Sequence, residues 1–321
     1  MKIFRKSLFV LFVLILSVTL LINWGWGRKK SNQIYIPVIS KGFQHQFWQA
    51  VKLGSEKAAK ELNVKITFEG PEGESQVDKQ IDMLQTALNK KPNAICLAAL
   101  DSKAAIPLLE KAKSMNIPII GFDSGVDSNI PLTTCATKNL EAAGLAADKM
   151  AEMIGGKGEV ALVVHDQTSR TGIDRRDGFV NRIKEKYPNI KIVDIQYGGG
   201  DQLKSTDLAK AIIQAHPNLK GIFGSNEGSA IGVVNAVKEL DKAGKLVVIG
   251  YDSGKLQTDA IRSGLMAGAI TQNPVGIGYE AVKAAVDAIN GKSLPKEIDT
   301  GFYWYDKSNI DDPKIKPNLY D

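Results

Sequence analysis

The chain has 321 residues, of which 44% are hydrophobic and 24% are charged, and its formal net charge is +6. This is the composition of a globular protein large enough for two domain-sized cores. Six of the 41 Lys and Arg residues, and none of the 35 Asp and Glu residues, lie within residues 1–30, so the rest carries 35 of each. A neutral body argues against nucleic acid as a partner.

The N-terminal segment has the first two parts of a secretory signal. Residues 8–22 are apolar except for two hydroxyl residues, and three basic residues precede them. No Ala-x-Ala-like site follows, and Asn-Trp-Gly-Trp-Gly at 23–27 resembles an interfacial anchor. The stretch 7–26 is also close to the ~20 residues that span a bilayer. We therefore expect residues 1–30 to be a signal peptide or an uncleaved signal anchor. The body is then exported, either anchored at the outer face of the cytoplasmic membrane or free in the periplasm or extracellular space.

After this segment, short apolar runs rich in β-branched residues alternate with amphipathic stretches whose apolar residues recur every three or four positions. The first pattern predicts strands and the second predicts helices. In the first half we expect strands at 33–39, 64–68, 94–98, 118–122 and 132–135, and helices at 47–62, 76–89 and 104–115.

The second half repeats this alternation. We expect strands at 160–164, 190–195, 221–223, 247–251 and 267–271, and helices at 140–154, 174–186, 207–215, 230–240, 257–263 and 275–290. Strand, helix and strand at this spacing predict right-handed βαβ units and a parallel sheet in each half. The fold class is therefore α/β, with two Rossmann-like lobes.

One stretch occurs twice. Ile-Pro-Ile-Ile-Gly-Phe-Asp-Ser-Gly at 117–125 returns as Leu-Val-Val-Ile-Gly-Tyr-Asp-Ser-Gly at 246–254. In both copies an acid, Asp123 or Asp252, stands just past the carboxyl end of the expected strand, which is the edge where ligands bind in open α/β sheets. Two such edges predict two lobes that face one small molecule.

Three interpretations of this acid pair stay open. The two acids could be the acid and base of a glycosidase, they could cap the helices that follow them, or they could bind a polyol. Polyol binding gains support from three polar residues at equivalent strand ends and helix starts. They are Arg175, Asn226 and Gln272. Carboxylate, amide and guanidinium groups match vicinal hydroxyls. The aromatic pair Phe47 and Trp48 could cover an apolar sugar face.

Other chemistry has little support in the sequence. A phosphate-loop-like stretch at 198–205 has Leu203 where a glycine must precede the lysine. The three histidines lack metal-like spacing. We expect no catalytic residue, metal or cofactor. Cys96 and Cys135 lie in strands that the strand ending near Asp123 would separate, so we expect two buried free thiols.

The chain resembles the type I periplasmic binding proteins over about residues 33–302, and most closely their ribose and galactose branch. The resemblance rests on the early aromatic pair, the two strand ends with their acids, and three further segments, Arg-Arg-Asp-Gly-Phe at 175–179, Ala-His-Pro at 215–217 and Thr-Gln-Asn-Pro at 271–274. It implies that eight residues line a sugar cleft: Phe47, Trp48, Asp123, Arg175, Asn226, Asp252, Gln272 and His45.

The sequence departs from this family pattern at two positions. Ser124 stands where ribose binders carry a second arginine, which puts ribose itself in doubt. Gly200 falls where they carry an aromatic residue that covers the second sugar face, and Tyr197 or His165 could take its place.

The resemblance also implies a multi-strand hinge, with crossings near Thr137, Gln272 and Gly301. The N-terminal lobe would then be 33–137 plus 273–301, and the C-terminal lobe 138–272 plus 302–321. The expected function is capture of a monosaccharide, a pentose or hexose, for the transmembrane subunits of an ABC importer, by a body that is a monomer. The alternative is a membrane-anchored sugar sensor that reports to a histidine kinase or chemoreceptor. The LacI-type repressors share such lobes, but here an apolar segment takes the place of a DNA-binding headpiece.

Overall fold

The structure is a computed structural model that describes residues 33–320. From Tyr35 onward the chain forms one compact unit. The predicted signal or anchor at 1–30 lies outside the described residues. Within residues 33–320, no helix has both the length and the apolar character needed to cross a membrane.

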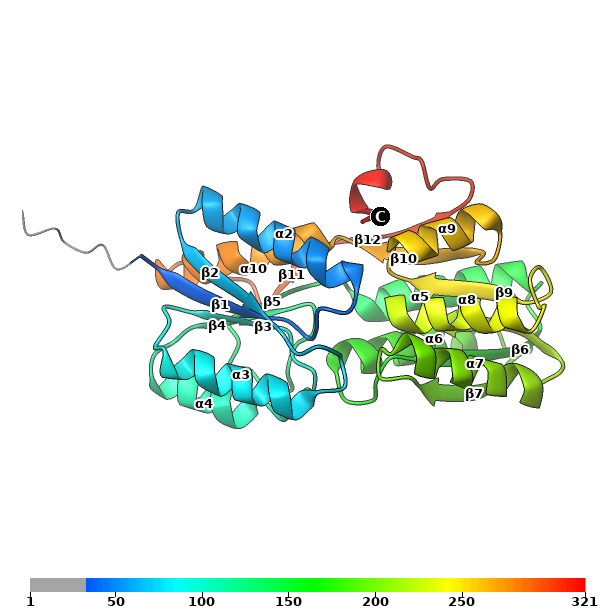
Figure 1. Cartoon of the computed structure of the whole chain (residues 1–321), viewed down its shortest axis with the longest axis horizontal. Helices are drawn as coiled ribbons and strands as arrows, with labels where there is room; N and C mark the ends of the chain where they lie inside the picture. The colour runs from blue at the N-terminus through cyan, green and yellow to red at the C-terminus, as the bar shows by residue number, and fades with distance from the viewer. Residues whose placement is uncertain (1–32, 321) are drawn as a thin grey trace, which may run out of the picture. The chain divides into compact units, whose positions relative to one another are not determined.

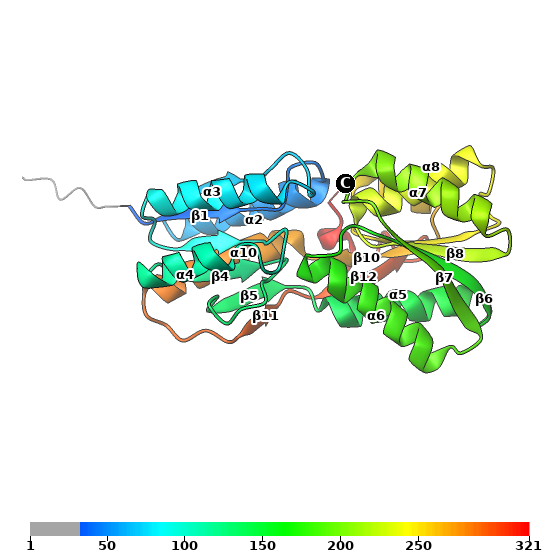
Figure 2. The ribbon, with the colours of Figure 1, turned by 90° about the horizontal axis from the view of Figure 1, so that it is seen from below.

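The first sheet is formed by six parallel strands. Helices α2 (Gln46–Glu61) and α10 (Pro274–Ile289) lie along one face, and α3 (Val77–Asn89) and α4 (Ile106–Ser114) lie along the other (Figures 1 and 2). Its strands, in the spatial order β11-β5-β4-β3-β1-β2, are β11 (Glu297–Asp299), β5 (Thr133–Ala136), β4 (Ile119–Phe122), β3 (Ile95–Leu97), β1 (Tyr35–Ile39) and β2 (Lys65–Glu69).

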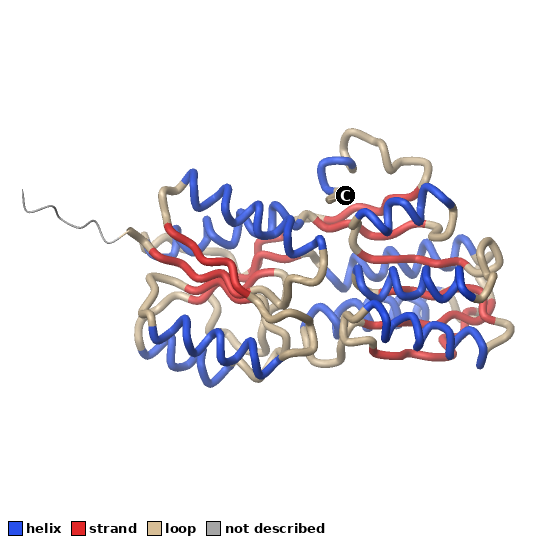
Figure 3. The backbone as a smooth tube through the Cα atoms, viewed as in Figure 1, coloured by secondary structure: helices blue, strands red, loops and turns tan. Residues whose placement is uncertain are grey.

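The second sheet has the same plan. Helices α5 (Asn139–Met153) and α6 (Arg170–Lys186) cover one face, while α7 (Gln202–Ala215), α8 (Glu227–Glu239) and α9 (Lys255–Ser263) cover the other (Figure 3). Its strands, in the order β12-β10-β9-β8-β6-β7, are β12 (Phe302–Asp306), β10 (Gly268–Gln272), β9 (Val247–Tyr251), β8 (Leu219–Gly224), β6 (Gly158–Val164) and β7 (Ile190–Tyr197).

The two strand orders match position by position, so β4 of the first sheet corresponds to β9 of the second. The central strands are buried because helices cover both faces of each sheet, which explains the near-continuous apolar sequences of these strands. The predicted α/β class with two Rossmann-like lobes is confirmed. We call the first sheet with its helices the N-terminal lobe and the second the C-terminal lobe.

The chain passes between the lobes three times. It leaves β5 for α5 at residues 137–138, returns from β10 to α10 at 273, and leaves β11 for β12 at 300–301. The side chains of Thr137 and Gln272 meet at this hinge, where the Thr137 hydroxyl donates to Gln272 Oε1 at 2.8 Å. Gly301 has a φ of 80°, a conformation that favours glycine.

Two glycines allow α2 and α10 to pack closely in the N-terminal lobe. A Cβ atom at Gly54 would stand 1.9 Å from the carbonyl oxygen of Val275, and one at Gly278 would stand 2.0 Å from that of Val51. Larger residues would force the helices apart. This packing fixes the start of α2, which carries Phe47 and Trp48.

The structure corrects the sequence analysis at the C-terminal end. Strand β12 pairs with β10 in an antiparallel direction, so the second sheet is not wholly parallel. Neither β11 nor β12 was among the expected strands. Both are short edge strands of three and five residues, and an edge strand carries little of the buried apolar signal that marks a central one.

The two cysteines are free and buried. Cys96 lies in β3 and Cys135 lies in β5, and β4 runs between these strands. Their separation agrees with the expectation of two buried thiols without a disulfide.

Candidate functional site

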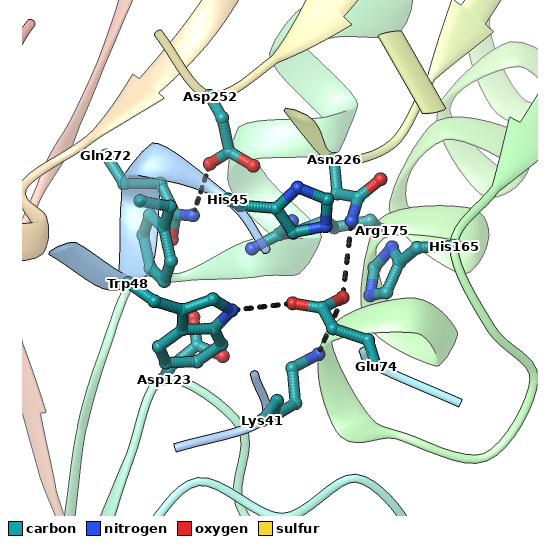
Figure 4. Close-up of a pocket in the computed structure, with 11 residues that line it drawn as sticks. Lys41, His45, Trp48, Glu74, Asp123, His165, Arg175, Asn226, Asp252 and Gln272 are labelled. Carbon is teal, nitrogen blue, oxygen red and sulfur yellow. Dashed lines mark hydrogen bonds and ion pairs between the residues drawn. The ribbon is translucent and has the colours of Figure 1, made fainter. Parts of the chain in front are cut away.

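The carboxyl ends of strands from both sheets meet at one pocket between the lobes (Figure 4). The topology brings together residues that follow β1, β2 and β4 in one lobe with residues that follow β6, β8 and β9, and the last residue of β10, in the other. All eight residues that the resemblance implied lie at this pocket. Its full lining is Lys41, His45, Phe47, Trp48, Glu74, Asp123, His165, Arg175, Asn226, Asp252 and Gln272.

The two acids of the repeated stretch occupy equivalent positions. Asp123 follows β4 and Asp252 follows β9, and both have a positive φ, 53° and 82° respectively. Aspartate tolerates this left-handed conformation better than most residues, and such backbone often marks functional sites. The equivalent strands are therefore both followed by a residue with positive φ, and each lobe contributes one of these carboxylates to the pocket.

Asp252 is held by two hydrogen bonds. Its Oδ1 accepts from Gln272 Nε2 at 2.7 Å, and its Oδ2 accepts from the backbone N–H of Glu227 at 2.9 Å. Asp252 thus hydrogen-bonds to the first residue of α8. The helix that follows Asp252 in the chain is α9, which begins at Lys255 and has Gly254 at its N-cap position. The idea that this acid caps its own following helix is wrong.

Asp123 differs because its carboxylate accepts no hydrogen bond from any other side chain or N–H group within residues 33–320. It is only 4% exposed. Burial raises the pKa of Asp123 to about 6, although Lys41 and Arg175 act in the opposite direction. A buried carboxylate with free lone pairs is a ready acceptor for ligand hydroxyl groups.

Arg175 is fixed from three sides. Its Nε donates to Asn139 Oδ1 at 2.7 Å, its Nη1 donates to the carbonyl oxygen of Ser225 at 2.9 Å, and its guanidinium stacks 3.8 Å over the ring of Tyr251. The Tyr251 hydroxyl donates to the same Asn139 oxygen. The forked donor is therefore rigid before any ligand arrives.

Two charged residues at the pocket, Lys41 and Glu74, were not among those expected from the sequence. Glu74 Oε1 accepts from Trp48 Nε1 at 2.8 Å, and Glu74 Oε2 accepts from Asn226 Nδ2 at 3.3 Å and lies 3.9 Å from Lys41 Nζ (Figure 4). Burial alone would raise the pKa of Glu74, but Lys41 and the Trp48 hydrogen bond help to hold it at about 2. Both residues follow strand ends, Lys41 after β1 and Glu74 after β2, and that position was the available signal.

Lys41 also reaches the other lobe, since its Nζ donates to Thr171 Oγ1 at 3.1 Å. It supplies a second buried cation beside Arg175. The position where ribose binders carry that second cation is Ser124 here, and its hydroxyl is buried with no hydrogen-bond partner among the described residues.

Gly200 stands where ribose binders carry an aromatic residue, and the sequence left open whether Tyr197 or His165 takes its place. A Cβ atom there would stand 2.9 Å from Glu74 Oε2, so the Glu74 carboxylate occupies the space that a larger residue would need. Tyr197 does not line the pocket, and its hydroxyl accepts from Arg176 instead. His165 does line the pocket, between Ser225 Oγ at 2.8 Å and Thr171 Oγ1 at 3.1 Å. Burial lowers the pKa of His165 well below its usual value, so the ring is neutral.

The pocket is narrow. Its volume of about 10 Å³ is close to that of a single water site. A molecule of several hydroxyl groups needs more room, so the walls of the pocket must move apart to hold one. The lining offers acceptors, forked donors and one aromatic wall, with Phe47 and Trp48 edge to face at 4.9 Å, so it can bind a small polar molecule with apolar C–H faces.

The chain is similar in sequence to known binding proteins for small sugars. A family model described as the periplasmic binding protein domain matches residues 36–293. The D-allose-binding periplasmic protein of Escherichia coli (strain K12) is 29% identical over 268 residues, which cover 80% of this chain and 86% of the relative. The ribose import binding protein of Bacillus subtilis (strain 168) is 25% identical over 272 residues, 85% of this chain and 86% of the relative.

Solved structures give the same result. An ABC transporter solute binding protein from Agrobacterium vitis with bound D-fucose is 33% identical, has a TM-score of 0.86, and is matched over 89% of this chain and 100% of its own. A carbohydrate transporter solute binding protein from Agrobacterium radiobacter in complex with D-arabinose is 32% identical, with a TM-score of 0.87 and coverage of 90% and 100%. These relatives are binding proteins and not enzymes.

Proposed function

The chain belongs to the periplasmic binding protein family, and from that premise we propose that it captures a monosaccharide outside the cytoplasm and presents it to an ABC importer. The observation that carries this proposal is the single pocket where strand ends of both lobes place Asp123, Arg175, Asn226 and Asp252 together. The ligand is a pentose or hexose, because relatives are named for allose and ribose or hold fucose and arabinose.

Each of the eight cleft residues expected from the sequence has a role in this proposal. Asp123 and Asp252 accept hydrogen bonds from sugar hydroxyls, Arg175 and Asn226 donate to them, and Gln272 positions Asp252. Phe47 and Trp48 cover one apolar face of the ring. His45, whose Nε2 is buried without a partner among residues 33–320, offers one more hydrogen bond.

The two lobes close by rotation about the three crossings at Thr137, at Gln272–Asn273 and at Gly301. A sugar that touches both lobes binds the closed form more tightly than the open form, and that difference is sufficient to drive closure. The closed form is what the permease recognises. One chain contributes both walls of the pocket, so sugar binding needs no residue from a second copy, and we propose that the body acts as a monomer.

Isothermal titration calorimetry against a panel of pentoses and hexoses tests whether the protein binds a monosaccharide and which one it binds. We expect heat with one or a few members, at micromolar or tighter affinity. Arg175→Met is the negative control, because it keeps the unbranched stem of the side chain and removes the guanidinium with its buried donors. If no sugar gives heat at protein concentrations that detect micromolar binding, the proposal fails.

The sensor alternative differs in its partner and not in its cleft. Relatives named as import binding proteins favour the importer. Capture from solubilised membranes with sugar-loaded protein separates the two functions. We expect permease subunits in the captured fraction, whereas a histidine kinase or chemoreceptor there would favour the sensor.

A further inference from the structure

Glu227 connects the two lobes through backbone groups. It is the first residue of α8 in the C-terminal lobe, and it is 5% exposed. Its Oε1 accepts from the N–H of Gln46 at 3.0 Å, and its Oε2 accepts from the N–H of Phe47 at 3.1 Å. These are the first two N–H groups of α2, which belongs to the N-terminal lobe.

Helix α2 has no cap of its own. His45 stands at the N-cap position but its side chain makes no capping hydrogen bond, and the first turn contains no acid. The first N–H groups of a helix have no partner within the helix, and the positive end of the helix dipole attracts a carboxylate. Glu227, which belongs to the other lobe, therefore caps the N-terminus of α2 in place of an N-cap side chain.

The exchange is reciprocal. Gln46 Oε1 accepts from the N–H of Lys255 at 2.7 Å. Lys255 is the first residue of α9 in the C-terminal lobe, and the residue before it, Gly254, has no side chain that could accept. Thus α2 receives its cap from α8 and gives a cap to α9.

This exchange lies outside the sugar cleft. Glu227, Gln46 and Lys255 line a separate hollow at the boundary between the lobes and are absent from the cleft lining. A direct link to the cleft exists nonetheless, because the backbone N–H of Glu227 donates to Asp252 Oδ2. Closure that places Asp252 against a ligand also places Glu227 against α2.

We propose that Gln46, Glu227 and the N–H of Lys255 form a closure latch, which stabilises the closed form by exchanging helix caps between the lobes. The inference rests on the proposed function, in which closure accompanies sugar binding. When the lobes separate, all three hydrogen bonds break and the helix ends return to water. Gln46 and Glu227 are therefore positioning residues that set affinity without touching the sugar.

The latch makes a specific quantitative prediction. Apparent affinity is scaled by the fraction of protein in the binding-competent form. Loss of a helix cap changes an equilibrium by roughly 2- to 30-fold. Removing the latch therefore weakens every sugar by the same factor and leaves the ratios among sugars unchanged, whereas removing a sugar contact changes those ratios.

The test compares Glu227→Gln and Gln46→Ala with the parent protein. Glu227→Gln keeps the size of the side chain and the backbone N–H that Asp252 needs, but replaces one acceptor oxygen by a donor. Gln46→Ala removes an exposed side chain. Matched controls are Glu239→Gln, at the other end of α8, and Gln49→Ala, which is exposed on the next turn of α2.

Two measurements decide the result. Titration calorimetry should give a common 2- to 30-fold weakening for all bound sugars, roughly as expected for one cap. Small-angle X-ray scattering without sugar should give a larger radius of gyration for the two latch variants than for the controls. Unchanged affinity and unchanged scattering would overturn the latch, and so would a weakening that differs among sugars. The scattering result stands even if the parent binds no sugar, which would instead refute the proposed function.

Discussion

Asp123 and Asp252 both have a positive φ just past the ends of equivalent strands, with values of 53° and 82°. Their surroundings nevertheless differ. Asp252 accepts two hydrogen bonds from protein donors, while the carboxylate of Asp123 accepts none from the other described residues. One acid is therefore part of a preorganised network, and the other is poised for a ligand.

The first prediction concerns Asp252→Asn. The amide cannot accept at both positions, so the Gln272 side chain or the Glu227 N–H loses its partner in a buried site. By comparison with buried charge pairs, we expect a loss of roughly 2–5 kcal/mol in sugar binding, which is a 30-fold or larger rise in the dissociation constant. Titration calorimetry measures this.

Asp241→Asn is the matched control for that change. Asp241 also has a positive φ, 50°, but it is exposed and lies outside the cleft. Equal affinities for Asp252→Asn and the parent would show that this acid has only a structural role.

The second prediction is a pH dependence from Asp123. Its pKa in the folded protein is raised from the ordinary 3.8 to about 6, and sugar hydroxyls that donate to the carboxylate favour its ionised form. Binding therefore releases a proton near pH 6. Affinity should rise by up to about tenfold per pH unit below 6 and level off above it. Titrations between pH 5 and 8 measure this dependence.

Asp123→Asn should remove that pH dependence. It should also alter stability, because a raised carboxyl pKa means that the folded protein holds the proton more tightly than the unfolded chain. The stability from this group is present below pH 3.8 and is lost as pH rises through about 6. A parent protein whose affinity stays constant from pH 5 to 8 would contradict the assignment of Asp123 as an acceptor.

The third prediction concerns Glu74. Its folded pKa is lowered from 4.5 to about 2, so the stability that it contributes is present above pH 4.5 and is lost as pH falls toward 2. Glu74→Gln leaves Lys41 buried without its carboxylate, and we expect lower stability at pH 7 and a smaller further loss in acid. Urea unfolding at several pH values measures both.

Glu72→Gln serves as the control for Glu74, because Glu72 is an exposed acid in the same loop. We expect that control to match the parent within experimental error. If Glu74→Gln unfolds like the control at every pH, the buried pair with Lys41 contributes nothing to stability.

The fourth prediction concerns the two thiols. Burial raises the pKa of Cys96 well above its usual value and raises that of Cys135 to about 12. The thiolate is the reactive form, so both should resist a thiol reagent at pH 8 in the folded protein and react fully in denaturant. A spectrophotometric thiol assay counts them, and rapid reaction of either one without denaturant would contradict the burial seen here.

The architecture and most of the cleft could be predicted from the amino-acid sequence alone. Alternating apolar runs and amphipathic stretches record the burial of each strand and helix, and the two copies of the stretch that contains Asp123 and Asp252 mark equivalent strand ends. Because parallel strands end at one edge of a sheet, residues that follow those strands could be placed together without coordinates.

The groups that meet across the lobes could be identified only from the three-dimensional arrangement of the two sheets. The pairs Asn226–Glu74 and Glu227–Gln46 are 152 and 181 residues apart, and each depends on how one sheet is placed against the other. No periodic pattern records that placement. The contacts between the lobes, including the closure latch, therefore became visible only when both lobes were seen together, whereas Lys41 and Glu74 lie in one lobe, after β1 and β2.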